Sequence, residues 1–272
     1  MSGMEELCNL LFEVSNEDRL RILLQLAEES MRITHLSKKL DLTTQESSRH
    51  TIRLAKAGLI QKEVDGFQHL TAYGKLVLRQ LPALQFISKH RDYFTSHSVT
   101  HLPLEFVSRM GELAGCTYTD DVMVFFHGVA TAIQEAEECI WVMVDQFLMS
   151  HVSSVREALE REVKMKTIEP KDWVAPREFY RIREEGERMW IAQARKKGLL
   201  EHKVLKKVEI YFHMSEKETV LAFPTLEGTF DHLGFTSTDE RSLKWCKDLF
   251  DYYWERAEPL YEPLRGYSQK RR

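Results

Sequence analysis

A helix pattern followed at once by a hairpin pattern, in residues 43–71, restricts the fold of this 272-residue chain more than any other feature. Thr43 and Glu46 have the spacing of a capping box, in which hydroxyl and carboxylate cap the first helical turn reciprocally. Gly58 is expected to end this helix, because glycine adopts the left-handed conformation without a Cβ clash. The following stretch EVDGFQHLT predicts a β-hairpin, closed by a type I′ turn at Asp65-Gly66.

Two further helix patterns precede this one. Asn16 is a candidate N-cap for a helix whose apolar positions recur at helical spacing, namely Leu20, Leu23, Leu24 and Ala27. A shorter helix follows, with Ile33, Leu36 and Leu40 on one face. The order helix, helix, capped helix, hairpin predicts a winged helix-turn-helix.

The two faces of the third helix differ in chemistry. Ser47, Thr51, Leu54 and Gly58 recur at i, i+4, i+7 and i+11, a small and mostly apolar face suited to packing. The opposite face carries hydrogen-bonding groups, guanidinium groups and one isoleucine, which suit a DNA major groove. We therefore predict DNA contacts from Thr44, Gln45, Ser48, Arg49, Ile52 and Arg53.

The wing extends this basic surface. Residues 43–62 hold four basic side chains against one acid, an excess of three positive charges in a chain of net charge −4. Lys62, Gln68 and His69 are expected to reach the DNA backbone or the neighbouring minor groove. The alternative is an ordinary three-helix domain whose polar face is solvated or binds protein.

The stretches SSRHTIRLAKAGLI and LTAYGKLVL, residues 47–60 and 70–78, resemble the ArsR-type winged helices. More narrowly, the chain is similar to archaeal regulators that join such a winged helix to a middle domain first associated with methanogenesis regulation. That resemblance extends through residues 128–145 and the closing WERAEPLY. It implies DNA contacts by Ser48, Arg49 and Arg53. Thr51 departs from the usual leucine, and the metal-sensing cysteine pair is missing, so metal sensing is not implied.

Helix and strand patterns alternate in the second half. CIWVMVDQ, residues 139–146, is typical of a strand buried on both faces, and a helix at 150–161 and a strand at 162–170 complete a parallel βαβ unit. A hairpin is expected at 207–223, and a final helix capped by Ser237. The fold class is thus an α+β winged helix-turn-helix domain at 1–81, a linker helix and loop at 82–102, and an α/β domain with a mixed sheet at 103–272.

Ligands of such sheets bind outside the carboxyl ends of parallel strands. Those ends here carry Asp145, Gln146, Lys171 and Trp173, and Tyr211 and His213 lie on a later strand, so we predict a site for a polar effector. Alternatively, Asp145 caps a helix and Trp173 is core. The architecture resembles the effector-binding domains of TrmB-like regulators, which are related in shape to phospholipase D. The catalytic motif of that enzyme is absent, since His202-Lys203-Val204 lacks its spacing.

No sequence signature of an enzyme is present. GxSxG, P-loop, GxGxxG and HExxH motifs do not occur. The four cysteines, Cys8, Cys116, Cys139 and Cys246, lie far apart, and His97 and His101 lack a third metal ligand. We expect no cofactor or metal. Without a signal peptide or a membrane-spanning run, the chain is expected in the cytoplasm.

These patterns predict a transcriptional regulator rather than an enzyme. Its partners would be double-stranded DNA, a second copy in a homodimer and a small-molecule effector. The sequence leaves two alternatives open for the α/β domain. In the first, this domain is an enzyme that uses the winged helix as an interaction module. In the second, it recruits other transcription proteins.

Overall fold

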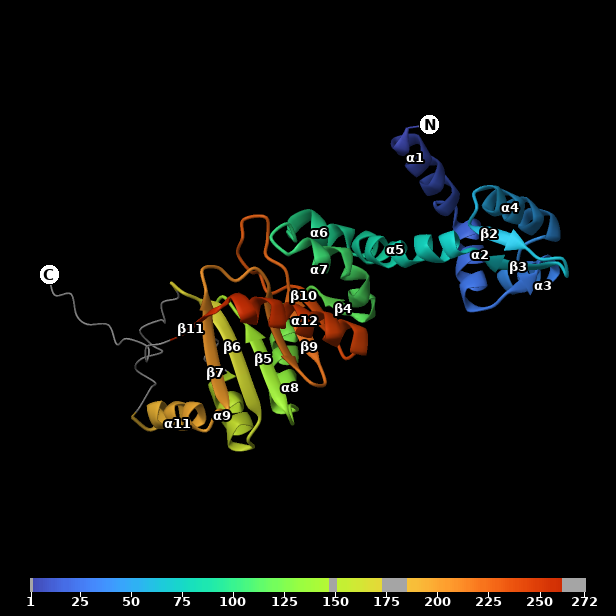
Figure 1. Ribbon diagram of the computed structural model, residues 1–272. Coiled ribbons are helices and arrows are strands. Elements are labelled where there is room, and N and C mark those ends of the chain that lie inside the picture. Colours follow the sequence, from blue (N-terminus) through green and yellow to red (C-terminus); the bar gives the residue numbers. More distant parts are fainter. Residues whose placement is uncertain (1, 147–150, 173–184, 261–272) are drawn as a thin grey trace. The chain divides into compact units, whose positions relative to one another are not determined.

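The computed structural model describes residues 2–146, 151–172 and 185–260, and the chain divides into two compact units, Met1–Leu84 and Gln85–Arg272 (Figure 1). Within the described residues, no helix is long and apolar enough to cross a membrane. Trp173, a predicted ligand residue, lies outside these residues.

Unit 1 combines helices with a small antiparallel sheet of order β1-β3-β2. Its helices are α1 (Gly3–Val14), α2 (Glu17–Glu28), α3 (Ile33–Leu40), α4 (Thr44–Lys56) and the first part of α5 (Ala72–Lys89). Its strands are β1 (Met31–Arg32), β2 (Ile60–Lys62) and β3 (Phe67–Leu70). The three predicted helices and the hairpin therefore occur in the predicted order.

In unit 1, the predicted capping residues lie at the helix ends where they were expected. The side chain of Asn16 accepts a hydrogen bond from the Arg19 N–H at the start of α2. Thr43 and Glu46 form the expected capping box on α4. Gly58 has φ +75°, so it ends α4 in the left-handed region that only glycine adopts without strain.

The core of unit 1 forms where α2, α3 and α4 meet. Ser47, Thr51 and Leu54 are buried on α4, as predicted. The prediction for α2 was wrong in part. Leu24 and Ala27 are exposed, whereas Ile22 and Leu26 join Leu23 in the core.

The turn of the hairpin differs from the predicted type I′. A type I′ turn needs positive φ at both central residues. Gly66 has φ +90°, but Asp65 does not have positive φ. The Gly66 N–H donates to the Glu63 carbonyl at 3.0 Å, and Glu63 N–H donates to Phe67 O at 2.8 Å. These bonds define a three-residue loop with a glycine bulge.

Unit 2 is built on an eight-stranded mixed sheet of order β11-β7-β6-β5-β8-β9-β10-β4. The strands are β4 (Thr117–Thr119), β5 (Cys139–Met143), β6 (Lys164–Pro170), β7 (Leu200–Leu205), β8 (Tyr211–Ser215), β9 (Thr219–Ala222), β10 (Gly234–Ser237) and β11 (Glu258–Pro259). The helices after α5 are α6 (Arg91–Ser96), α7 (Leu104–Ser108), the 3₁₀ helix η1 (Met110–Gly115), α8 (Val122–Gln134), α9 (Val152–Glu160), α11 (Glu185–Lys196) and α12 (Glu240–Arg256).

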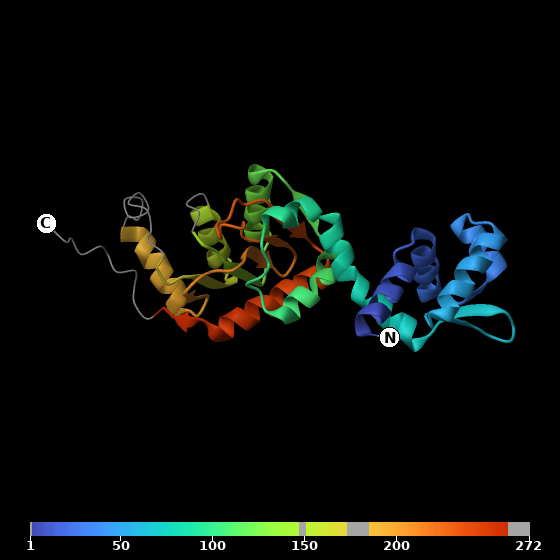
Figure 2. The ribbon, with the colours of Figure 1, turned by 90° about the horizontal axis from the view of Figure 1, so that it is seen from above.

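The predicted parallel unit is β5-α9-β6, and β7 extends it in parallel, while the other strand pairs are antiparallel. Helices α8 and α9 lie on one face of the sheet and α12 on the other (Figure 2). The α8 face holds a core that includes Phe125, Val142 and Tyr211. The mixed sheet is therefore confirmed.

Several details of unit 2 differ from the prediction. Asp239 rather than Ser237 caps α12, because its side chain accepts hydrogen bonds from the N–H groups of the first turn. Strands β4, β7, β10 and β11 were not foreseen. The predicted linker 82–102 is not a separate element: α5 runs through Pro82, and Tyr93 is buried in unit 2.

Candidate functional site

The outward face of α4 presents most of the predicted DNA contacts to solvent. Thr44, Gln45 and Arg49 are exposed, Ser48 is half-buried, and Ile52 is 65% exposed. An isoleucine so exposed on a folded helix has no packing role within this unit. The face is therefore polar at its N-terminal end, with one guanidinium and one methyl-rich side chain.

The side chain of Arg53 is paired with Glu13 of the same unit and is not free to contact DNA. Its Nη2 and Nε lie 2.5 and 3.1 Å from the two carboxylate oxygens of Glu13 on α1. The guanidinium also lies 5.2 Å from the ring centroid of Phe12. Hydrogen bonding from Arg53 is the main cause that lowers the pKa of Glu13. A DNA contact by Arg53 would require this ion pair to open, and the sequence pattern gave no sign of the pair.

The wing residues divide into accessible and inaccessible groups. Lys62 is exposed, and His69 is half-buried with its Nδ1 at 3.4 Å from Glu63. Gln68 is only 3% exposed, because β3 lies between β1 and β2 and Gln68 pairs with both Met31 and Lys62. The predicted DNA contact by Gln68 is therefore wrong.

A group of titratable side chains lies together on the α8 face of unit 2, where β5 ends. We call the following five residues the histidine cluster: Asp145, His151, Tyr211, His213 and His232. Asp145 follows β5, His151 precedes α9, and His232 precedes β10. His213 is paired in register with Val142 on β5. Asp145, Tyr211 and His213 were predicted from the sequence, whereas His151 and His232 were missed.

Ring positions show that the cluster is contiguous. The centroids of Tyr211 and His213 are 5.4 Å apart, those of Tyr211 and His232 are 5.1 Å apart, and those of His151 and His213 are 6.3 Å apart. The four buried polar atoms Asp145 Oδ1, Tyr211 Oη, His213 Nδ1 and His232 Nε2 have no hydrogen-bond partner among the described residues.

Burial drives every shifted group of the cluster toward its neutral form. It raises the pKa of Asp145, an effect that nearby His232 opposes. Burial lowers the pKa of His151 and His232, and it lowers the pKa of His213 to about 3. The pKa of the Tyr211 hydroxyl is raised by the same cause. The imidazoles are therefore neutral at pH 7.

The other predicted ligand residues do not join the cluster. Gln146 is exposed. Lys171 is also exposed, and its Nζ pairs with Glu258 on the edge strand β11 at 2.8 Å. The ammonium group of Lys171 is therefore directed toward β11 and not toward the end of β5. Trp173 lies outside the described residues.

A serine and a histidine at the end of α6 form a chain of contacts with Asp231, which lies in the loop before β10. Ser96 Oγ is 2.9 Å from His97 Nδ1, and His97 Nε2 is 3.1 Å from Asp231 Oδ2. Ser96 Oγ, however, also lies 3.0 Å from the Tyr93 carbonyl, as does His97 Nδ1 at 2.9 Å. Such contacts with the last turn of a helix are typical of a C-terminal cap. The chain of contacts ties α6 to the loop before His232 rather than activating the serine.

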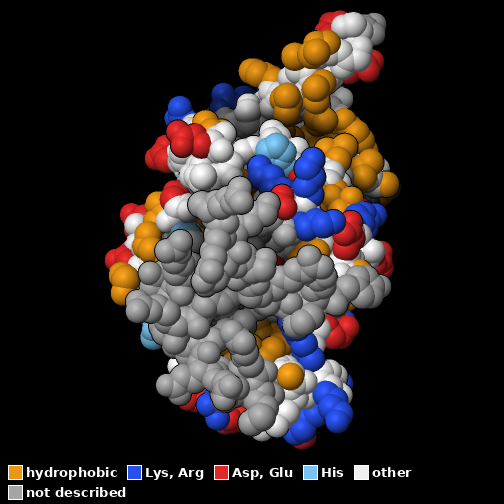
Figure 3. Space-filling model, turned by 90° about the vertical axis from the view of Figure 1, so that its left-hand side faces the viewer, with side chains coloured by type: hydrophobic (Ala, Val, Ile, Leu, Met, Phe, Trp, Pro, Cys, Tyr) orange, Lys and Arg blue, Asp and Glu red, His pale blue; other side chains and the backbone are white. Residues whose placement is uncertain are grey.

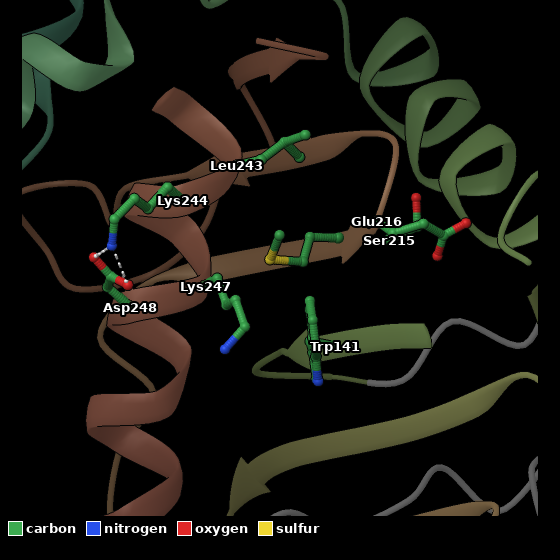
Figure 4. A pocket seen from close by; sticks show the side chains of 8 residues that line it. Trp141, Ser215, Glu216, Leu243, Lys244, Lys247 and Asp248 are labelled. Atoms are coloured by element: carbon green, nitrogen blue, oxygen red, sulfur yellow. Dashed lines mark hydrogen bonds and ion pairs between the residues drawn. The ribbon is translucent and has the colours of Figure 1, made fainter. Parts of the chain in front are cut away.

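The opposite face of the sheet contains a cavity of about 450 Å³ between β5, β8 and α12 (Figure 4). Its charged groups are already paired. Lys244 Nζ lies 2.7 Å from Asp248, Lys247 lies over the Trp141 ring at 5.4 Å, and the Glu216 carboxylate accepts the N–H of Cys139. No group of three or more histidine, cysteine or acidic side chains in the described ranges is arranged to hold a metal ion.

Stability is expected to fall on acidification because of the buried imidazoles. On unfolding, the pKa of His213 returns to about 6.5, so below that pH the unfolded chain binds a proton that the folded chain does not. Between pH 7 and pH 5 this proton uptake by the unfolded chain lowers the free energy of unfolding by about 2 kcal/mol for His213 alone.

Denaturant unfolding at both pH values measures this loss of stability. His213→Gln should flatten the pH dependence and the exposed His127→Gln should not; equal pH dependence in both variants would contradict the assignment.

No family model matches the sequence, and no curated protein matches it. Among solved structures, the chain is similar to TrmBL2, an archaeal chromatin protein, with 16% identity, 90% and 94% of the two chains covered and a TM-score of 0.43. It is similar to Nuc, a phospholipase D family member from Salmonella typhimurium, with 13% identity over 54% of this chain and 97% of that one, and a TM-score of 0.36. The methyltransferase SibL gives 12% identity over 74% and 63%, and a TM-score of 0.27. Backbone agreement this loose bears on neither family nor function.

Proposed function

We propose that this protein is a sequence-specific DNA-binding transcriptional regulator, and that unit 1 is a winged helix-turn-helix. The observation that carries the proposal is the division of α4 into a buried face and an exposed face. Ser47, Thr51 and Leu54 are buried, whereas Gln45, Arg49 and Ile52 are exposed on the opposite side.

The exposed side chains match the groups of a major groove. Arginine binds guanine bidentately, glutamine binds adenine, and an aliphatic side chain packs on the thymine methyl. Recognition helices place their N-terminal residues at the base edges, which is where Thr44, Gln45, Ser48 and Arg49 lie on α4. The exposed Lys62 on β2 then supplies a phosphate contact from the wing.

Selection from a pool of random duplexes by the full chain tests this function. A sequence-specific regulator enriches one motif after repeated rounds. Two recognition helices in a dimer would make that motif a pair of half-sites about one helical turn apart. Binding without enrichment of any motif would reduce unit 1 to a phosphate-binding module.

The wing is expected to add affinity without specificity. Lys62→Ala removes one phosphate contact, so it should weaken binding to all duplexes to a similar degree and lower the salt slope of log K by about 1. Binding isotherms at several salt concentrations measure both quantities. A loss confined to the preferred duplex would instead assign Lys62 to base recognition.

The homodimer that we propose would form through α1. Met4, Leu7 and Leu11 recur at i, i+3 and i+7 and are 69%, 48% and 45% exposed. Figure 3 shows hydrophobic side chains gathered along this helix. Such a stripe exceeds the scattered single exposures that are normal for a monomer.

Leu7→Glu is expected to convert the dimer to a monomer, because it places a charge in the apolar stripe. Light scattering coupled to size exclusion measures the mass. Leu104→Glu is the matched control, since Leu104 is 80% exposed and belongs to unit 2 rather than to α1. A wild-type monomer at micromolar concentration would contradict the dimer.

A further inference from the structure

The histidine cluster leaves four buried polar atoms without partners in one place. A buried polar group without a hydrogen bond destabilises the folded state relative to a hydrogen-bonded one. Buried polar groups in folded proteins are nearly always satisfied by protein, by ordered water or by a ligand. Four such atoms in one cluster are therefore the groups with which a bound molecule would pair.

The cluster is held in place by contacts outside it. Asp231 pairs with His97 Nε2 at 3.1 Å and accepts the Leu233 N–H at 3.1 Å, so the loop around His232 is fixed at both sides. His232 itself has φ +59°, a conformation that costs energy for a non-glycine residue. Strain retained beside unpartnered polar atoms is typical of functional sites.

The unpartnered groups are suited to a ligand that donates hydrogen bonds and carries a positive charge. Asp145 is the acid of the cluster, and no lysine or arginine belongs to it; Lys171, which the sequence predicted for this site, is paired with Glu258. A neutral imidazole offers one nitrogen lone pair, and the phenol oxygen of Tyr211 also accepts. Carboxylate, imidazole and phenol thus provide several acceptors for one donor group.

Aromatic rings alternate with these acceptors. The Phe126 centroid lies 4.8 Å from that of His232 and 6.3 Å from that of His151, and Phe125 lies 5.7 Å from Tyr211. Aromatic faces attract organic cations. The same interleaving agrees with the finding that the described residues contain no three metal-ligating groups close enough for one ion.

We propose that the histidine cluster binds the ammonium group of a small organic amine. Asp145 supplies the counter-charge, and His213, His232 and Tyr211 accept N–H groups. The site is separate from the α4 surface, so the proposal does not depend on DNA binding. In a regulator, the amine would be the effector.

Histidine ring NMR of the full chain tests this assignment. The probes are methylammonium, putrescine and phenethylammonium, each compared with the alcohol of the same skeleton. At least one amine should shift the ring nitrogens of His213 and His232 saturably, and its alcohol should not. An equal response to amine and alcohol, no response to any amine, or a saturable response to zinc chloride alone would overturn the proposal.

Variants separate binding from folding. Asp145→Asn should weaken binding of the amine about tenfold or more, because the amide keeps an acceptor oxygen but loses the counter-charge, and Tyr211→Phe should weaken it less. Lys171→Ala is the matched control at the neighbouring strand end and should leave affinity unchanged. Tryptophan fluorescence confirms that each variant is folded. Unchanged amine affinity in folded Asp145→Asn would also overturn the assignment.

Discussion

Replacing Trp245 with alanine is expected to lower the free energy of unfolding of unit 2 by about 3–5 kcal/mol. Trp245 lies on α12 and is fully buried. Its Nε1–H donates to the Phe106 carbonyl at 3.1 Å, and its ring meets the Phe106 ring edge to face at 5.9 Å. The substitution therefore leaves a cavity and an unpaired carbonyl together, and both effects destabilise.

Denaturant unfolding followed by tryptophan fluorescence isolates this effect. All five tryptophans of the chain lie in unit 2, so the signal reports that unit alone. The half-buried Trp254 is the matched control on the same helix. Trp254→Ala should lower the free energy of unfolding less than Trp245→Ala does. A loss below 1 kcal/mol for Trp245→Ala would show that α12 is not central to the packing of unit 2.

Replacing Arg49 with alanine is expected to weaken binding to the preferred duplex by about 1–3 kcal/mol and to relax preference at one base pair. The guanidinium is exposed on α4, and its removal would delete the bidentate base contact that we propose without disturbing the buried face. Competition with duplexes that vary at each position measures both effects. Arg156→Ala is the control, because this arginine is exposed on α9 and pairs with Glu160 of the same helix. Equal losses on preferred and random duplexes would contradict base recognition by Arg49.

The sequence was sufficient to predict those features whose signals lie close together in the chain. The capping box at Thr43, the stop at Gly58 and the period of α4 lie within sixteen residues, so the helix and its two faces were predicted. Strand alternation likewise placed Tyr211 and His213 on one face of β8. These features depend on backbone conformation and on neighbours close in the chain.

The errors arise from contacts between distant segments. Gln68 is buried because the two-residue strand β1 pairs with β3, and so short a strand has no readable pattern. Arg53 is bound by Glu13, forty residues earlier, and Lys171 by Glu258, eighty-seven residues later. His151 and His232 join the cluster from a helix start and a loop. Neither position has a periodicity that predicts its side-chain direction.

Binding of the full chain to fragments of its own upstream region and to random duplexes, at two salt concentrations, tests the DNA-recognition proposal most directly. Phosphate contacts weaken steeply with salt on every sequence, whereas base contacts preserve a preference. We predict that the upstream fragment binds more tightly and that the preference persists at the higher salt. Equal binding to both, lost equally as salt rises, would contradict recognition of bases by α4.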